Sequence, residues 1–152
     1  PTIYGKDHSD WGIEDTQNYQ PSIGKFHRLR KGKDVNIFAM GSMVYNSIVA
    51  AQLLDKEGIS AGVVNASTIK PVDEEVVIQC AKEAPIVTVE DHNILGGMGS
   101  AIAEVVAQHQ PQKMKLHGVR DIFGQSGDVA ELEKQYHLDP ESIKQVVKEF
   151  LS

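Results

Sequence analysis

The sequence predicts an α/β fold: a three-layer α/β/α sandwich with a five-stranded mixed sheet whose first strand is antiparallel to the other four. Two observations support this prediction. Short apolar runs rich in β-branched residues alternate with segments that have the 3.6-residue period of amphipathic helices. The order strand, helix, strand, helix produces parallel strands joined by crossover helices on both faces of one sheet. The length of 152 residues fits a single domain.

Residues 1–24 differ from the rest of the chain. They are rich in Asp, Gly, Asn and Pro and have no hydrophobic period, so we expect an extended linker or arm that comes from a preceding domain. Thr2–Tyr4 could form a short strand within it. Trp11 and Tyr19 are unusual in a polar arm, and two roles stay open for them: anchoring on another surface, or local packing. The α/β domain then spans residues 25–152.

A hairpin and a helix are expected to open this domain. Residues 25–30 form a short strand, Gly32–Asp34 form a tight turn, and residues 34–40 form a strand that runs antiparallel to the first. A helix then begins at Ser42, whose side chain is the expected N-cap, and ends at Gly58.

The strand–helix alternation continues to the end of the chain. Strands are expected at residues 61–66, 85–90 and 113–119, and helices at 73–84 and 96–109. Asp128 and Asp139 are the expected N-caps of two final helices. The last helix carries an apolar stripe, formed by Ile143, Val146, Val147, Phe150 and Leu151.

Charge and cysteine content exclude several classes of protein. Fifteen Lys and Arg residues against 21 Asp and Glu residues give a net charge of −6, which argues against nucleic acid and against an anionic membrane as partners. No apolar stretch approaches about 18 residues, and no basic segment leads into an apolar one, so neither a membrane span nor a signal peptide is expected. Cys80 has no partner for an internal disulfide, which favours the reducing cytoplasm. Because it lies on the apolar face of its helix, we expect a buried, unreactive thiol.

The most informative segment is a glycine-rich turn between a strand and a helix, from Thr88 to Ala101. It follows the carboxyl end of a strand, where α/β sheets usually place ligands. The dinucleotide fingerprint fits only in part, because Ile102 stands where its third glycine or alanine belongs, and no Walker sequence is present. We therefore interpret the turn as a surface that packs against a neighbouring domain. Its candidate interface residues are Glu90, Asp91, His92, Asn93, Gly96, Gly97 and Gly99.

Two expectations follow from this interpretation. Asp91, His92, Asn93 and Ile94 should be partly exposed in this chain and buried in the intact protein. The glycines remove side chains, so that another backbone can approach closely. A Gly97→Val change should therefore disturb assembly more than the fold if the φ angle of Gly97 is negative.

The sequence contains no complete active site. Glu90, Asp91 and His92 are adjacent on an extended segment and point in different directions, so we do not expect them to converge on a metal or a reacting group. The other histidines are scattered, and no serine lies in a Gly-x-Ser-x-Gly elbow. Ser42 and Ser100 are interpreted as helix caps. No catalytic, cofactor-binding or metal-binding residue is assigned, which predicts a module that completes or supports another protein unit.

Five short motifs occur in a fixed order along the chain: Gly41–Val44, Thr68–Asp73, Val87–His92, Gly96–Ala101 and Phe123–Gly127. In this order they resemble the C-terminal domain of transketolases, in particular the end of the C-terminal subunit of split bacterial transketolases. The resemblance spans nearly the whole chain.

The resemblance implies an enzyme that uses thiamine diphosphate and a divalent metal (Mg2+ or Ca2+) to move a two-carbon ketol unit between sugar phosphates. The family's diphosphate–metal motif begins Gly-Asp-Gly, whereas Gly127-Asp128 is followed here by Val129. We therefore expect this chain to be inactive alone, to bind neither cofactor, and to serve interdomain and dimer packing. Its partners would be the remaining transketolase domains or subunit, in a homodimer.

Two other functions stay open. The chain could be the equivalent domain of deoxyxylulose-phosphate synthase or of a 2-oxo acid dehydrogenase β subunit, although Thr68–Asp73 and Glu90–His92 favour transketolase. A free-standing nucleotide-binding module could instead use the Gly96–Gly99 turn, and a rise in melting temperature with NAD would favour it.

Overall fold

The computed structural model describes residues 3–5, 8–13 and 16–152, and these form one five-stranded sheet flanked by helices. The strands are β1 (His27–Arg30), β2 (Val35–Ala39), β3 (Ala61–Asn65), β4 (Ile86–Asn93) and β5 (Met114–Val119). Their order across the sheet is β1-β3-β2-β4-β5. β1 pairs antiparallel with β3, and the other pairs are parallel. The expected mixed sheet with an antiparallel first strand is confirmed.

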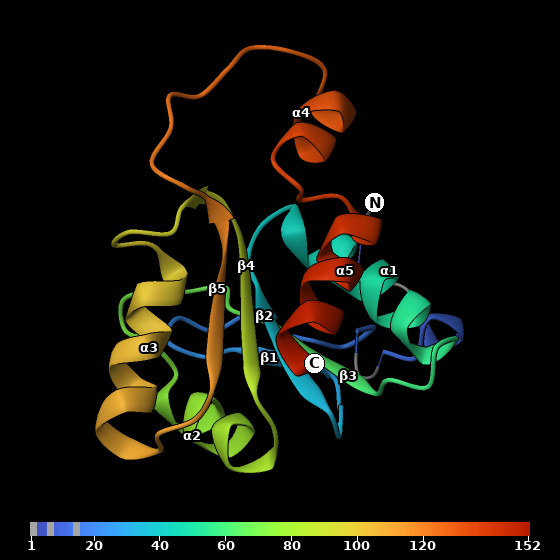
Figure 1. The fold of residues 1–152 in the computed structure, drawn as a ribbon. Coiled ribbons are helices and arrows are strands. Elements are labelled where there is room, and N and C mark those ends of the chain that lie inside the picture. Colours follow the sequence, from blue (N-terminus) through green and yellow to red (C-terminus); the bar gives the residue numbers. More distant parts are fainter. Residues whose placement is uncertain (1–2, 6–7, 14–15) are drawn as a thin grey trace.

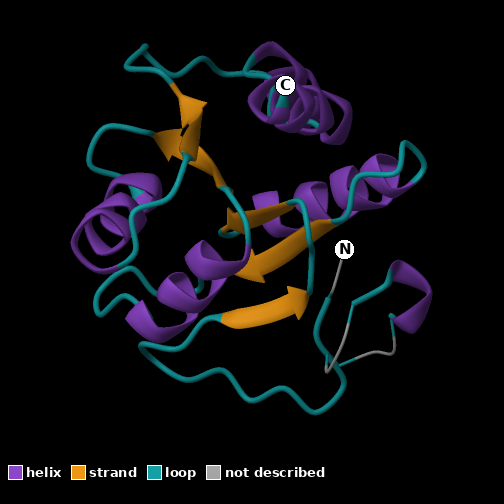
Figure 2. Ribbon diagram, turned by 60° about the horizontal axis from the view of Figure 1, so that its bottom comes forward, coloured by secondary structure: helices purple, strands orange, loops and turns teal. Residues whose placement is uncertain are grey.

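Helices cover both faces of the sheet. They are η1 (Ser9–Trp11, one 3₁₀ turn), α1 (Met43–Asp55), α2 (Glu74–Glu83), α3 (Met98–His109), α4 (Val129–Gln135) and α5 (Pro140–Leu151). Figure 1 shows α1 and α5 on one side of the sheet and α2 and α3 on the other, and Figure 2 shows the sheet between the two layers. Among the described residues, no helix is both long and apolar enough to cross a membrane.

The sheet separates two apolar clusters. Successive strand residues point to opposite faces, so Ile37 packs with Ile48 and Ile143 under α1 and α5, whereas Phe38 packs with Val77 and Ile102 under α2 and α3. Both sides of the central strands are therefore buried, which explains their continuous apolar sequences.

The expected hairpin between the first two strands is wrong, because β3 lies between β1 and β2. The turn at residues 31–34 passes across the start of β3, where the backbone nitrogens of Lys33 and Asp34 donate to the carbonyl of Ser60 at 3.1 and 3.0 Å. A Cβ at Gly32 would overlap the backbone nitrogen of Gly62. β2 is buried along its whole length, whereas β1 alternates between buried and half-buried residues. The more apolar strand, β2, thus lies at the centre of the sheet, and β1 lies at its edge.

Residues 3–24 pack on the domain where the structure describes them. Tyr19, Tyr4 and His27 form a three-ring cluster, in which the Tyr19 centroid lies 4.7 Å from that of Tyr4 and 4.0 Å from that of His27. Trp11 meets the edge of Tyr45 in α1 at 5.7 Å, and Ile13 belongs to the cluster under α1 and α5. Of the two roles open to the aromatic residues, the structure shows local packing. Thr2, in the expected short strand, lies outside the described residues, and its neighbours at positions 3 and 4 are not in a strand.

The Cys80 thiol is fully buried on α2, among the apolar residues that face α3 and the sheet. Burial raises the pKa of this thiol to about 11, so the reactive thiolate is scarce at neutral pH. We expect a thiol reagent to label Cys80 only after unfolding by denaturant. Cys80→Ala should lower the free energy of unfolding by about 1 kcal/mol, since it removes one buried sulfur. Rapid labelling of the native chain would contradict this expectation.

Candidate functional site

The glycine-rich turn is held from inside by a buried carboxyl group. Glu90, near the carboxyl end of β4, is fully buried. Its Oε2 accepts a hydrogen bond from the backbone nitrogen of Met98 at 2.8 Å, and its Oε1 accepts one from Gly99 at 2.9 Å. These nitrogens belong to the first turn of α3, where free N–H groups need acceptors. Glu90 therefore acts as the cap of α3, although it lies eight residues before the helix.

Two glycines make room for this cap. A Cβ at Gly97 would lie 2.6 Å from the Asn93 carbonyl oxygen and 2.8 Å from Glu90 Cδ. A Cβ at Gly99 would lie 2.6 Å from Thr88 Oγ1. The φ angle of Gly97 is −86°, which is the case in which we expect Gly97→Val to disturb assembly more than the fold. The space around Gly97 predicts a cost to the fold as well, because a Cβ there would overlap its neighbours whatever the φ angle.

The two serines interpreted as helix caps have other roles. Ser100 lies inside α3, and its Oγ donates to the Ile94 carbonyl at 2.9 Å and accepts from the Gly96 nitrogen at 3.0 Å, which closes the turn. Ser42 stands before α1 but makes no side-chain cap bond. Its Oγ donates instead to Asp91 Oδ2 at 2.9 Å. In contrast, the expected caps Asp128 and Asp139 accept hydrogen bonds from their helices. Asp73, at the predicted start of α2, does the same.

The outward-facing residues of the turn form a polar rim. Asp91 and His92 are exposed, and Asn93 and Ile94 are half-buried. Asn93 fixes the rim from both sides: its Oδ1 accepts from the Leu95 nitrogen at 2.9 Å, and its Nδ2 donates to Asp121 at 3.2 Å. The expected partial exposure of residues 91–94 in this chain is confirmed.

Glu90, Asp91 and His92 do not converge, as the sequence predicts. Glu90 points into the domain, whereas Asp91 and His92 lie on the surface. Among the residues that the structure describes, no group of three or more His, Cys, Asp or Glu side chains could hold a metal ion. The N–H groups that would cradle a phosphate at the start of α3 are already bonded to Glu90. This arrangement disfavours the nucleotide-binding alternative, because a phosphate would have to displace a buried carboxyl group.

An apolar surface that the sequence motifs do not predict adjoins the rim. Ile122, Phe123 and Val129 are exposed by 57%, 100% and 70%, and they lie on the segment between β5 and α4 or at the start of α4. Figure 1 shows this segment and α4 standing away from the sheet beyond the ends of β4 and β5. No residue of α4 is buried. A hollow of about 410 Å³ lies between α4 and the turn, and Asp91, His92, Ile122 and Val129 are among its lining residues.

We call Asp91, His92, Ile122, Phe123 and Val129 the carboxyl-end surface. Large apolar side chains exposed beside polar ones are typical of interaction sites. The sequence contains an indication of this surface: Ile122 and Phe123, two large apolar residues, are adjacent in a loop that contains glycine. The pattern alone could not show whether the domain buries them.

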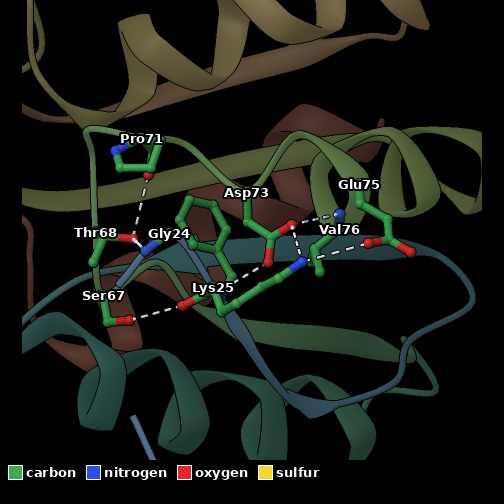
Figure 3. Close-up of polar contacts among 9 residues, drawn as sticks. Gly24, Lys25, Ser67, Thr68, Pro71, Asp73, Glu75 and Val76 are labelled. Carbon is green, nitrogen blue, oxygen red and sulfur yellow. Dashed lines mark hydrogen bonds and ion pairs between the residues drawn. The ribbon is translucent and has the colours of Figure 1, made fainter. Parts of the chain in front are cut away.

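A second polar cluster joins the start of β1 to α2 (Figure 3). Buried Asp73 accepts from the Phe26 nitrogen at 2.9 Å and from the Val76 nitrogen at 3.4 Å. The Gly24 nitrogen donates to Thr68 Oγ1 at 3.0 Å, and Ser67 Oγ donates to the Lys25 carbonyl at 3.1 Å. These bonds fix the direction in which the chain enters the sheet. The motif Thr68–Asp73 thus has a structural role, because the side chains of Thr68 and Asp73 hold the start of β1 and the start of α2 together.

The fold and these sites define a class of protein: an α/β domain with a hydrogen-bonded turn and an apolar surface at the carboxyl end of its sheet, and without converging catalytic groups among its described residues. The family model of the transketolase C-terminal domain matches residues 24–143. This chain belongs to that family.

Individual relatives agree with this assignment. The chain is 46% identical, over 128 residues, to a transketolase C-terminal section from Methanocaldococcus jannaschii, covering 84% of this chain and 40% of that protein. It is 42% identical, over 129 residues, to 1-deoxy-D-xylulose-5-phosphate synthase from Heliobacterium modesticaldum, covering 84% of this chain and 20% of that protein. A solved split-gene transketolase, described as an inactive beta4 tetramer, superposes with a TM-score of 0.84 at 34% identity, covering 92% of this chain and 47% of that one. The chain thus spans less than half the length of these relatives.

Proposed function

We propose that this chain is the non-catalytic C-terminal domain of a thiamine diphosphate-dependent transketolase, and that it serves packing between domains and between the subunits of a homodimer. The intact enzyme would transfer a two-carbon ketol unit between sugar phosphates in the cytoplasm. The observation that carries the proposal is the carboxyl-end surface, where exposed apolar residues adjoin the hydrogen-bonded turn. Such a surface favours contact with another protein unit.

The residues of this chain do not fit a diphosphate–metal site. The sequence contains no Gly-Asp-Gly triplet, since Gly127-Asp128 is followed by Val129, and the N-terminus of α3 is capped by Glu90. We therefore assign cofactor binding, with thiamine diphosphate and Mg2+ or Ca2+, to other domains of the intact enzyme. The 152-residue chain alone should show no ketol transfer.

A second candidate function rests on the 42% identity to 1-deoxy-D-xylulose-5-phosphate synthase. The domain would have the same packing role in that enzyme. Formation of 1-deoxy-D-xylulose 5-phosphate by the intact protein, without ketol transfer, would favour this candidate.

The packing role predicts that Phe123→Asp weakens assembly of the intact subunit. Phe123 is fully exposed, so the variant should keep its melting temperature. A buried aromatic contact in the assembly would be lost, and a central aromatic residue can contribute about 2 kcal/mol or more, or roughly thirtyfold in the dissociation constant. Sedimentation of the intact protein over a concentration series measures this change.

The matched control is Ala107→Asp, which adds the same charge at an exposed position near the C-terminal end of α3, at the other end of the sheet. It should sediment like the wild type. If Phe123→Asp also assembles like the wild type, the carboxyl-end surface is not an interface.

A further inference from the structure

A second and larger hollow lies between β5 and α5. It measures about 800 Å³. Lys115 and His117 form its floor, because they pair with Val87 and Val89 of β4 and so share the sheet face that α5 covers farther in. Val146 and Phe150 of α5 contribute an apolar wall. We call this hollow the β5–α5 groove.

The β5–α5 groove is basic in an acidic chain. Lys113, Lys115 and Arg120 line it, and Glu149 is the sole carboxylate among its lining residues, all of which the structure describes. The chain as a whole has a net charge of −6. The groove thus gathers three cations against one carboxylate, on a chain whose net charge is negative.

Two of these cations have no partner in the described part of the chain. Lys115 is half-buried, yet neither it nor Arg120 forms an ion pair or a side-chain hydrogen bond there. Lys113, in contrast, donates to the Phe150 carbonyl at 2.6 Å and lies over the Phe150 ring. Lys115 and Arg120 thus place two positive charges at the groove without a counter-charge from the described residues, and both would attract an anion there.

His117 adds a third polar group to the floor. It is 6% exposed, and its Nε2 donates to the His137 carbonyl at 2.8 Å, which leaves Nδ1 as the acceptor in the neutral ring. Burial lowers the pKa of His117, the hydrogen bond to the His137 carbonyl opposes this effect, and the positive charges of Arg120 and Lys115 add to the lowering. Glu149 on α5 is the acidic group across the groove, and it accepts a hydrogen bond from Gln145. A bound anion would oppose the surrounding positive charge and favour protonation of His117.

We propose that the β5–α5 groove binds a small organic dianion, a phosphate monoester whose body packs on Val146 and Phe150. Two unpaired cations beside a histidine that can take up a proton match the charge of a phosphate monoester near pH 7. The volume lies in the range of small-molecule sites, which combine apolar walls with a few polar groups. Ile122 is the one residue of the carboxyl-end surface that also lines the groove. The proposal does not depend on the packing role, because neither of the two unpaired cations belongs to that surface.

The test uses NMR of the full 152-residue chain, with inorganic phosphate and phenyl phosphate as probes and chloride at equal ionic strength as the reference. Both phosphates should shift the ring signals of His117 saturably and raise its pKa, and phenyl phosphate should bind more tightly because of its apolar ring. Lys115→Met should weaken binding by about tenfold or more, which corresponds to about 1.4 kcal/mol.

Lys82→Met is the matched control, because Lys82 is an exposed lysine on α2, in the layer on the opposite face of the sheet. It should bind both probes like the wild type. The proposal is overturned if chloride produces the same shifts, if His117 does not respond, or if Lys115→Met and Lys82→Met bind phosphate equally. Because the dispersed signals of each variant report its fold in the same spectra, a misfolded variant is recognised directly, and Arg120→Met then replaces it.

Discussion

Replacing Glu90 by alanine should lower the free energy of unfolding by about 3–5 kcal/mol. The change leaves two buried N–H groups of α3, those of Met98 and Gly99, without an acceptor. It also creates a cavity, because Glu90 is one of the largest fully buried side chains of the domain. Both effects act on the start of the helix that packs against α2 and the sheet.

Urea denaturation of the purified chain measures this loss. Glu90→Gln keeps the volume and one acceptor oxygen, so it should cost less, about 1–3 kcal/mol. Glu104→Ala is the control, since Glu104 is exposed on the same helix and should change stability by less than about 0.5 kcal/mol. A cost below about 1 kcal/mol for Glu90→Ala would show that water or backbone movement replaces the cap.

Gly97→Val should destabilise the isolated domain by about 3 kcal/mol or more, despite the ordinary φ angle at this position. The new Cβ would overlap the carboxyl group of Glu90 and the Asn93 carbonyl. Neither can move easily, because Glu90 is bonded to α3 and the Asn93 side chain is bonded on both sides. For a chain of this size, such a loss lowers the melting temperature by roughly 6–12 °C.

Gly97→Ala distinguishes overlap of the Cβ itself from overlap of the larger valine side chain. Because it adds only the Cβ, it should already show most of the loss in the free energy of unfolding. Gly124→Val is the control, since a Cβ at Gly124 meets nothing within 4 Å and its φ angle is not positive. A Gly97→Val chain that melts like the wild type but fails to assemble in the intact protein would support the original interpretation of the turn as a backbone contact surface.

The strands and most helices could be predicted from the hydrophobic pattern, because the side chains that face the core recur with the period of each element. Period does not encode which strands are neighbours, so the insertion of β3 between β1 and β2 was missed. The relevant signal was the pair Gly32 and Gly62, whose backbones touch. It could be interpreted only with the pairing already known.

The sequence predicted the position of the glycine-rich turn correctly, but it did not predict that Glu90 caps α3 from the inner side of the turn. A glutamate at the end of an apolar strand is usually exposed. The residue type at position 90 therefore gave no indication that this side chain is buried and caps a helix. Glycines at positions 97 and 99 were consistent with that cap, yet equally consistent with close approach of another chain. Only the distances from Glu90 to the helix nitrogens decide between these explanations.

The lack of buried residues in α4 affects how tightly the carboxyl-end surface can bind. A helix of seven residues is marginal in water without support from a core, so ordering α4 and the loop before it opposes association with an entropic cost. The binding free energy of a contact made there would therefore be smaller than its buried area suggests. If subunits join through this surface, as proposed, they should exchange faster than those of dimers built from well-packed faces. Their assembly would then be reversible and would depend on protein concentration.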